Sequence, residues 1–193
     1  SWDVAAFEVC GHKWVDLSEG GFGVSILNDC KYGHDIKEGT MRLTLLKSSC
    51  DPNPYADKEE HFLKYSLYSH EGTWKDSDTV ELAYQLNTPL FTRVEEAHEG
   101  DLNSSLSLVK LDKNNVMIEV VKKAEDSDYI VVRIYEFHNK RTNVTMEFMK
   151  DLFDVMECDL MEEKINSMEI IENNKIKFII NPFEIKSIKI KFK

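Results

Sequence analysis

The sequence predicts an all-β fold, an antiparallel β-sandwich with one short helix. Short segments in which apolar and polar residues alternate follow one another along the 193 residues. Turn-forming residues separate these segments at a spacing of about 8 to 12 residues, which is typical of antiparallel sandwiches. One segment, residues 77–87, instead has apolar residues at three-residue steps, which is typical of a helix.

The first strand that we expect lies within residues 16–36. Its apolar residues alternate on one face: Phe22, Val24 and Ile26. Glycines at its start permit a tight turn, and a polar loop at residues 28–35 follows it. Residues 40–46 alternate in the same way, so we expect them to pair with this strand through a turn at residues 36–39.

The rest of the first half predicts an entry segment, a long loop, another strand and the helix. Residues 7–16 should form an extended entry in which Trp14 packs against a sheet. Residues 48–61 contain two prolines, two aspartates and one asparagine, which predicts an exposed loop. An aromatic-rich strand is expected at residues 61–69, and Ser77 is the expected amino-terminal cap of the helix.

The second half predicts a series of strands after a polar crossing at residues 95–105. Their expected ranges are 105–112, 115–124, 128–137, 142–149, 166–172, 175–180 and 183–192. We place a domain boundary in the crossing and expect two units, residues 1–97 and 98–193. The pattern of residues 152–160 fits a helix and a strand equally well.

Charge and composition limit the class of partner. The formal net charge of −11 means that the surface repels phosphate backbones and anionic membranes, so we expect no nucleic-acid and no membrane partner. No apolar run approaches the roughly 20 residues that cross a bilayer, and no signal peptide is visible. The four scattered cysteines lack a metal-binding or redox spacing and are typical of reduced thiols, which predicts a cytoplasmic location.

Motifs for catalysis or metal binding are lacking in the sequence. Its 35 acidic residues include no pair that differs from an ordinary solvated sheet face. The six histidines are isolated and match no zinc-binding pattern. Neither Gly-x-Ser-x-Gly nor a phosphate-binding glycine motif occurs. We therefore expect no catalytic residue, no metal ligand and no cofactor in this chain.

The polar loop after the first strand is the best candidate for a binding site. Asp29, Lys31 and Tyr32 combine two charges with an aromatic hydroxyl, a mixture that suits sugar binding. The alternative is that Asp29 and Lys31 pair across a tight turn while Tyr32 packs beneath them. Asp16, Ser18 and Glu19 form a weaker candidate for a cleft or a docking face, although Asp16 and Ser18 also suit a structural turn at this place.

Several segments carry a resemblance to a known family. They are HKWVDLSEGGFGVSILNDCKYGHDI, MRLTLLKS, PYADKEEHFLKYSLYSHEG, VKKAEDSDYIVVRIYEFHN and NPFEIKSIKIKF. In content and order they resemble the carboxy-terminal β-sandwich region of glycoside hydrolase family 38, the zinc-dependent α-mannosidases. The resemblance implies that residues 1–97 end a central β-supersandwich and that residues 98–193 form a smaller carboxy-terminal sandwich. It also implies that residues 152–160 form a strand.

The resemblance implies a function for a longer protein. Family 38 enzymes hydrolyse terminal α-mannose residues with retention, and their nucleophilic Asp and zinc ligands lie in an amino-terminal catalytic domain. This chain would be a non-catalytic part that packs on that domain of the same polypeptide and is inactive alone. Loops of this region reach the sugar pocket in the family, which implies that Asp29, Lys31 and Tyr32 contact a mannose-containing oligosaccharide or brace the catalytic loops. Contacts in a homo-oligomer are a further expected role.

Two other classes of function stay open. A carbohydrate-binding β-sandwich module would hold sugar without hydrolase activity. Such modules usually carry a planar row of aromatic residues, whereas Trp2, Trp14 and Trp74 are scattered in the sequence. A purely structural or assembly domain would bind no sugar. Titration of the chain with mannose identifies the first class, and the activity of the complete protein separates an enzyme part from the second.

Overall fold

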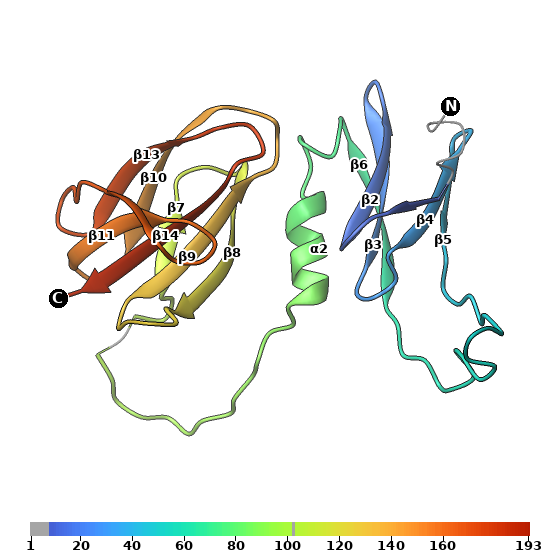
Figure 1. The fold of residues 1–193 in the computed structure, drawn as a ribbon, viewed down its shortest axis with the longest axis horizontal. Helices are drawn as coiled ribbons and strands as arrows, with labels where there is room; N and C mark the ends of the chain where they lie inside the picture. The colour runs from blue at the N-terminus through green and yellow to red at the C-terminus, as the bar shows by residue number, and fades with distance from the viewer. Residues whose placement is uncertain (1–7, 102) are drawn as a thin grey trace. The chain divides into compact units, whose positions relative to one another are not determined.

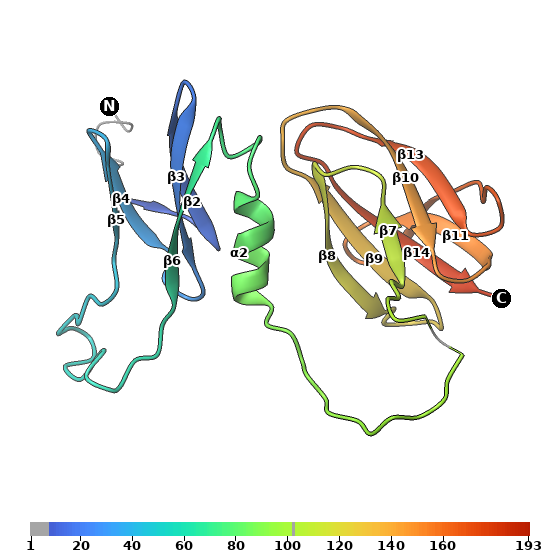
Figure 2. The same ribbon diagram turned by 180° about the vertical axis from the view of Figure 1, so that it is seen from behind.

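The computed structural model describes residues 8–101 and 103–193, and the chain divides into two compact units, Ser1–Glu96 and Ala97–Lys193 (Figures 1 and 2). Among the described residues, the strands pair antiparallel and α2 (Thr79–Asn87) is the one helix. The predicted all-β fold with one short helix is therefore confirmed. The assignment of residues 1–97 and 98–193 to two regions of a family 38 enzyme stays a prediction. Trp2 lies outside the described residues.

The first unit contains two three-stranded sheets. One sheet has the order β1–β4–β5 and is formed by β1 (Glu8–Cys10), β4 (Gly33–Lys37) and β5 (Thr40–Leu43). The other has the order β2–β3–β6 and is formed by β2 (Trp14–Glu19), β3 (Phe22–Asn28) and β6 (Tyr65–Glu71). Helix α2 packs alongside the second sheet, in contact with β2 and β3 (Figures 1 and 2).

Strand β3 is the middle strand of its sheet, and its two faces differ in character. The alternation of a strand separates Gly23, Ser25 and Leu27 from Phe22, Val24 and Ile26. Helix α2 covers the face of Ser25, whose Oγ lies 2.8 Å from Oγ1 of Thr79. Ser25 is fully buried, whereas Phe22 on the other face is 54% exposed. The face with the smaller and more polar residues is therefore the covered one.

The predicted pairing of residues 40–46 with the first strand is wrong. Strand β5 pairs with β4, and β3 pairs with β2 and β6 instead. The reason is that residues 33–37, which we assigned to the loop and turn, are themselves extended and hydrogen-bond to β5. The hairpin between β4 and β5 turns at Glu38 and Gly39, and both residues have the positive φ that suits a two-residue turn.

Helix α2 begins slightly later than predicted. Asp78 occupies its N-cap position without a side-chain capping bond, so the prediction of Ser77 as the cap is wrong. Ser77 Oγ still accepts a hydrogen bond from the N–H of Thr79 at 3.3 Å. At the other end, Nδ2 of Asn87 donates to the carbonyl oxygen of Asn28 at 2.9 Å, which ties the helix to the end of β3.

The second unit is a β-sandwich. Its larger sheet has the order β12–β11–β14–β9–β8, with β8 (Val116–Lys123), β9 (Ile130–Glu136), β11 (Leu152–Cys158), β12 (Lys164–Ser167) and β14 (Ile185–Phe192). Its smaller sheet has the order β13–β10–β7, with β7 (Val109–Leu111), β10 (Thr142–Phe148) and β13 (Lys175–Ile180). Inward-facing residues of both sheets form one buried core, including Ile134, Ile188, Met146, Phe148 and Ile176.

Two segments of the second unit bear on the predictions: one settles an open choice between helix and strand, and the other shows that a predicted strand is wrong. Strand β11 shows that residues 152–158 are extended rather than helical. The predicted strand at residues 166–172 is wrong for most of its length, because β12 ends at Ser167 and the chain then turns tightly before β13. Glu172 and Asn173 form this turn with positive φ.

Candidate functional site

The loop from β3 to β4, residues 29–32, carries the three residues predicted to bind a ligand. The N–H of Asp29 donates to the carbonyl oxygen of Lys64 at 3.2 Å, and its Oδ1 accepts from the N–H of Lys64 at 3.0 Å. Hydrogen bonds from the Cys30 thiol and the Lys64 amide hold the pKa of the Asp29 carboxyl below its ordinary value. Asp29 therefore anchors the loop to the segment before β6, and its carboxylate bonds the backbone of Lys64 rather than Lys31.

Tyr32 is oriented by its ring and by its backbone. The ring of His12 stacks on it, with ring centroids 4.3 Å apart and an angle of 11° between the planes. The carbonyl oxygen of Tyr32 accepts hydrogen bonds from the N–H of Gly11 at 2.9 Å and from Nδ1 of His34 at 3.1 Å. Tyr32 is 40% exposed, so a ligand can reach a side chain that is already held in position.

Two fully buried polar side chains flank the loop. Asn28 ends β3 and His34 lies in β4, and neither has an exposed surface. The side-chain amide of Asn28 and Nε2 of His34 make no hydrogen bond with the described residues. A buried polar group without a partner costs about 1 to 3 kcal/mol, so such groups need a functional or structural reason. At the base of the loop, hydrogen bonds hold the backbone in place, while the side-chain amide of Asn28 and Nε2 of His34 have no hydrogen-bond partner among the described residues.

Asp16 lies at the centre of a buried hydrogen-bond cluster under α2. Its carboxylate accepts hydrogen bonds from the hydroxyl of Ser18 and from Oγ of Ser25, the latter at 2.8 Å. It also lies 2.7 Å from Nε2 of His70, and the Asp16 and His70 side chains are 3% and 2% exposed. Ser25 continues the cluster to Thr79 in α2. We define these five residues as the Asp16 cluster, and it joins three strands to the helix.

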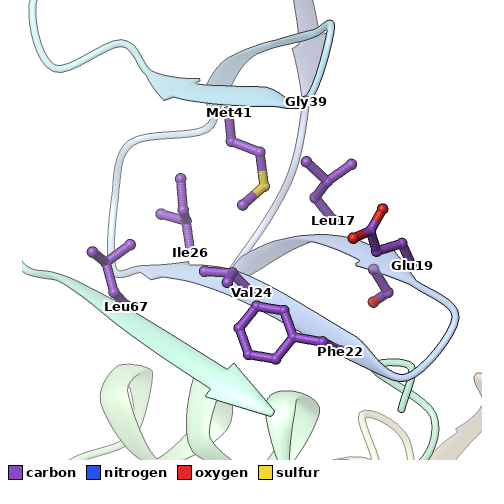
Figure 3. Close-up of a pocket in the computed structure, with 9 residues that line it drawn as sticks. Leu17, Glu19, Phe22, Val24, Ile26, Gly39, Met41 and Leu67 are labelled. Atoms are coloured by element: carbon purple, nitrogen blue, oxygen red, sulfur yellow. The ribbon is translucent and has the colours of Figure 1, made fainter. Parts of the chain in front are cut away.

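Glu19 lies on the other face of β2 and lines an apolar groove of about 650 Å³ (Figure 3). Figure 3 shows Val24 and Phe22 along the floor of the groove and Met41 of β5 above them. Because Asp16 and Glu19 are three positions apart on one strand, the alternation sends them to opposite faces. The structure therefore does not bring these two candidate residues together.

Four residues of these arrangements were missed by sequence reasoning: His12, Ser25, His70 and Thr79. No local sequence pattern indicates His12 or His70 as a site residue, because the residues that they contact, Tyr32 and Asp16, are 20 and 54 positions away. Ser25 had a signal, since it lies directly opposite Asp16 in the β2–β3 hairpin. A glycine within a strand also marks a close approach, and Gly23 lies directly opposite His70.

The described residues offer no further chemical site of a familiar kind. Among them, no three His, Cys, Asp or Glu side chains gather where they could hold a metal ion. No helix in this part of the chain is long and apolar enough to cross a membrane. All four cysteines are free; Cys158 is buried, and Cys10, Cys30 and Cys50 are exposed.

Two family models match the chain. The model described as the glycosyl hydrolases family 38 C-terminal domain matches residues 1–55, and the model described as the C-terminal beta sandwich domain of that family matches residues 115–188. This chain belongs to the carboxy-terminal region of glycoside hydrolase family 38. The predicted family is therefore confirmed.

Curated relatives of this family 38 chain are named α-mannosidases. Alpha-mannosidase 2C1 of Homo sapiens is 34% identical over 192 residues, which cover 97% of this chain and 18% of that protein. Alpha-mannosidase G of Dictyostelium discoideum is 36% identical over 192 residues, with the same shares. The family 38 chain thus spans less than a fifth of the length of these relatives.

Solved structures have the same fold as the family 38 chain. The crystal structure of an alpha-mannosidase from Enterococcus faecalis V583 superposes with a TM-score of 0.74 at 19% identity. The match covers 95% of this chain and 21% of that chain. The arrangement of strands described above is therefore that of a region within a much longer structure.

Proposed function

We propose that this chain is a non-catalytic carboxy-terminal part of an α-mannosidase that hydrolyses terminal α-mannose residues with retention of configuration. The observation that carries the proposal is the match to proteins named α-mannosidases along 97% of the chain. In this role the chain packs on the catalytic domain of the same polypeptide. It is a scaffold for that domain and is inactive alone.

The loop at residues 29–32 is the part of the chain that we assign to the sugar. Its anchors support this assignment, because Asp29 is fixed by Lys64 and Tyr32 is fixed by His12 before any ligand binds. The Asp29 carboxylate accepts from sugar hydroxyls, and the Lys31 ammonium and Tyr32 hydroxyl donate to them. The proposed ligand is a mannose-containing oligosaccharide that the catalytic domain holds from its other side.

We assign the catalytic carboxylates and the zinc to the catalytic domain, outside this chain. A retaining glycosidase needs two carboxyl groups about 5 to 5.5 Å apart across the scissile bond. The acidic side chains at the loop and the cluster already have structural partners, Asp29 at Lys64 and Asp16 at His70. They are suited to positioning rather than to nucleophilic attack.

Hydrolysis assays on the complete protein test this proposal. The product of the whole reading frame should hydrolyse p-nitrophenyl α-mannoside and leave the β-mannoside intact, and NMR should detect the α-anomer of mannose as the first product. Absence of α-mannoside hydrolysis would contradict the proposal. Hydrolysis by the 193-residue chain alone, at the rate of the complete protein, would contradict it as well.

A titration separates the proposal from a carbohydrate-binding module. The 193-residue chain should not bind mannose or a mannose oligosaccharide at millimolar concentration, because the loop supplies one side of the pocket only. Saturable binding by this chain, measured by calorimetry, would favour the module.

We also propose a cytoplasmic location and self-association into a homo-oligomer. The exposed thiols of Cys10, Cys30 and Cys50 support the location, since exposed thiols oxidise outside reducing compartments. Cell fractionation tests the location, and mass photometry of the complete protein tests the oligomer.

A further inference from the structure

The open face of the β2–β3–β6 sheet carries apolar residues where a solvated face would carry polar ones. The register sets three rows across it: Glu19, Phe22 and Glu71; Leu17, Val24 and Ser69; Val15, Ile26 and Leu67. Phe22 is 54% exposed, Leu67 71% and Leu17 38%. Antiparallel sheets that are covered on one side normally present polar residues on the other. Since α2 covers the opposite face, the composition of this open face is that of a sheet covered on both sides.

The cover that the chain itself supplies is partial. Met41 of β5 lies over the groove, and beneath this end Ile26 is only 7% exposed (Figure 3). Two parts of the groove stay open: Phe22 at the other end of β3, and Leu67 on β6, directly beside Ile26. Burial of a large apolar side chain contributes about 1.5 to 3 kcal/mol, so the exposed side chains of Phe22 and Leu67 favour a partner that covers them.

Charge at the rim indicates what the partner presents. Glu19 and Glu71 are the register neighbours of Phe22 on β2 and β6, and both are exposed. A matching surface therefore has apolar side chains for Phe22 and Leu67 and a Lys or Arg for the two carboxylates. A second copy of this chain matches poorly, because each copy has a net charge of −11.

We propose that a segment of the same polypeptide outside residues 1–193 packs on this face, with its apolar side chains over Phe22 and Leu67 and a basic side chain at Glu19 and Glu71. This inference rests on the proposed function, since it takes the chain to be part of an α-mannosidase. More than four-fifths of the length of the curated relatives lies outside the part that this chain matches, so the segment required is available within one polypeptide.

Photo-crosslinking in the complete protein tests the proposal. Leu67→p-benzoylphenylalanine places the reactive group on β6, at the exposed side of the groove, and mass spectrometry identifies the peptide that it captures. The expected product is an intramolecular crosslink to a peptide outside residues 1–193. The matched control is Leu90→p-benzoylphenylalanine, at a leucine that is 93% exposed and does not line the groove. It should not capture the same peptide.

Four results would overturn the proposal. They are a crosslink only to residues within 1–193, a crosslink between two copies in a mixture of light and heavy protein, no crosslink at position 67, and capture of the same peptide from position 90. Oxidation by hydroxyl radicals gives a second measurement without a variant. Phe22 and Leu67 should be oxidised at least tenfold more slowly in the complete native protein than in the urea-unfolded protein, and equal rates would also overturn the proposal.

The α-mannosidase assay on the same wild-type sample separates this inference from the proposed function. Capture of an outside peptide without α-mannosidase activity retains the docking surface and contradicts the proposed function. α-Mannosidase activity without capture of an outside peptide retains the proposed function and contradicts the docking surface.

Discussion

At the residue scale, Gly23 makes room for the Asp16 cluster. A Cβ atom on Gly23 would lie 2.3 Å from Cε1 of His70 and 2.6 Å from Oγ of Ser18. Neither atom can move away easily, because both side chains are hydrogen-bonded to the Asp16 carboxylate. Gly23→Ala should therefore lower the free energy of unfolding by about 1 to 3 kcal/mol, the usual cost of overpacking a core. Urea denaturation measures the change.

The neighbouring Gly21 is the control for this substitution. A Cβ atom there meets nothing within 4 Å, so Gly21→Ala should change stability by no more than about 0.5 kcal/mol. Equal effects of the two substitutions would show that the His70 ring does not require the glycine.

The Asp16–His70 pair should be essential for stability because it is buried. Asp16→Asn replaces one acceptor oxygen by an amide NH2 that cannot accept from Ser25 or His70, and a buried donor left without its acceptor costs about 1 to 3 kcal/mol. Glu19→Gln, an exposed position on the same strand, should cost no more than about 0.5 kcal/mol. Thermal and urea unfolding of both variants decide whether the pair is structural, and a small effect of Asp16→Asn would contradict that role.

Sequence reasoning could choose the candidate residues but not their contacts. Asp29, Lys31 and Tyr32 do lie in one loop, as the polar run predicts, with Tyr32 exposed and the other two half-buried. Their contact with sugar stays a prediction. Asp16 and His70 are 54 residues apart, and nothing in local pattern indicates that β6 places one beside the other. The stack of His12 on Tyr32 arises in the same way from tertiary structure.

At the element scale, Glu136 joins the end of β9 to neighbouring loops. Burial disfavours the charged carboxylate, but hydrogen bonds from the N–H of Phe183, Nδ2 of Asn115 and the N–H of His138 outweigh this, and the pKa of Glu136 lies below its ordinary value of 4.5. Its stabilising effect is therefore full above pH 4.5 and is lost as the pH falls through the lowered pKa.

The second unit should show this dependence directly. The free energy of unfolding, measured with urea at pH values from about 7 to about 3, should fall below pH 4.5 in the wild type. Glu136→Gln should be less stable at neutral pH and should lose less stability as the pH falls below 4.5. Glu147→Gln, at an exposed position in β10, should follow the wild-type curve. Parallel curves for Glu136→Gln and the wild type would contradict the role of Glu136.

Elements were easier to predict than their pairing. Alternation of apolar residues identified β3 and most strands of the second unit, and in the second unit it did so because one face of these strands is buried in the core. The partner of β5 was predicted wrongly, because its actual partner β4 is short and mostly polar and resembles a loop in sequence. The N-cap of α2 was also misplaced, because Ser77 bonds Thr79 and the carbonyl of Trp74 from just before the helix.

At the scale of the whole molecule, the β2–β3–β6 sheet reverses the usual arrangement of a half-buried strand. The apolar row of β3 predicts a buried face, but the structure buries the face of Ser25 under α2 and leaves Phe22 open. This reversal could not be predicted from the row itself, because the segment that we propose as its cover lies outside residues 1–193. A sheet of this kind is expected in a region that is one part of a longer enzyme.

The loop at residues 29–32 is, in the proposed function, a contributor to a sugar pocket on an otherwise structural region. The most direct test of this role is the kcat/KM of the complete protein for p-nitrophenyl α-mannoside with Lys31→Met and with Tyr32→Phe, beside Lys37→Met at the exposed end of β4 as the control. Each lost hydrogen bond to the sugar should lower kcat/KM about tenfold, which corresponds to about 1.4 kcal/mol, with unfolding unchanged. We predict that loss for both loop variants and none for Lys37→Met; values within twofold of the wild type for all three would contradict a role of the loop in the pocket.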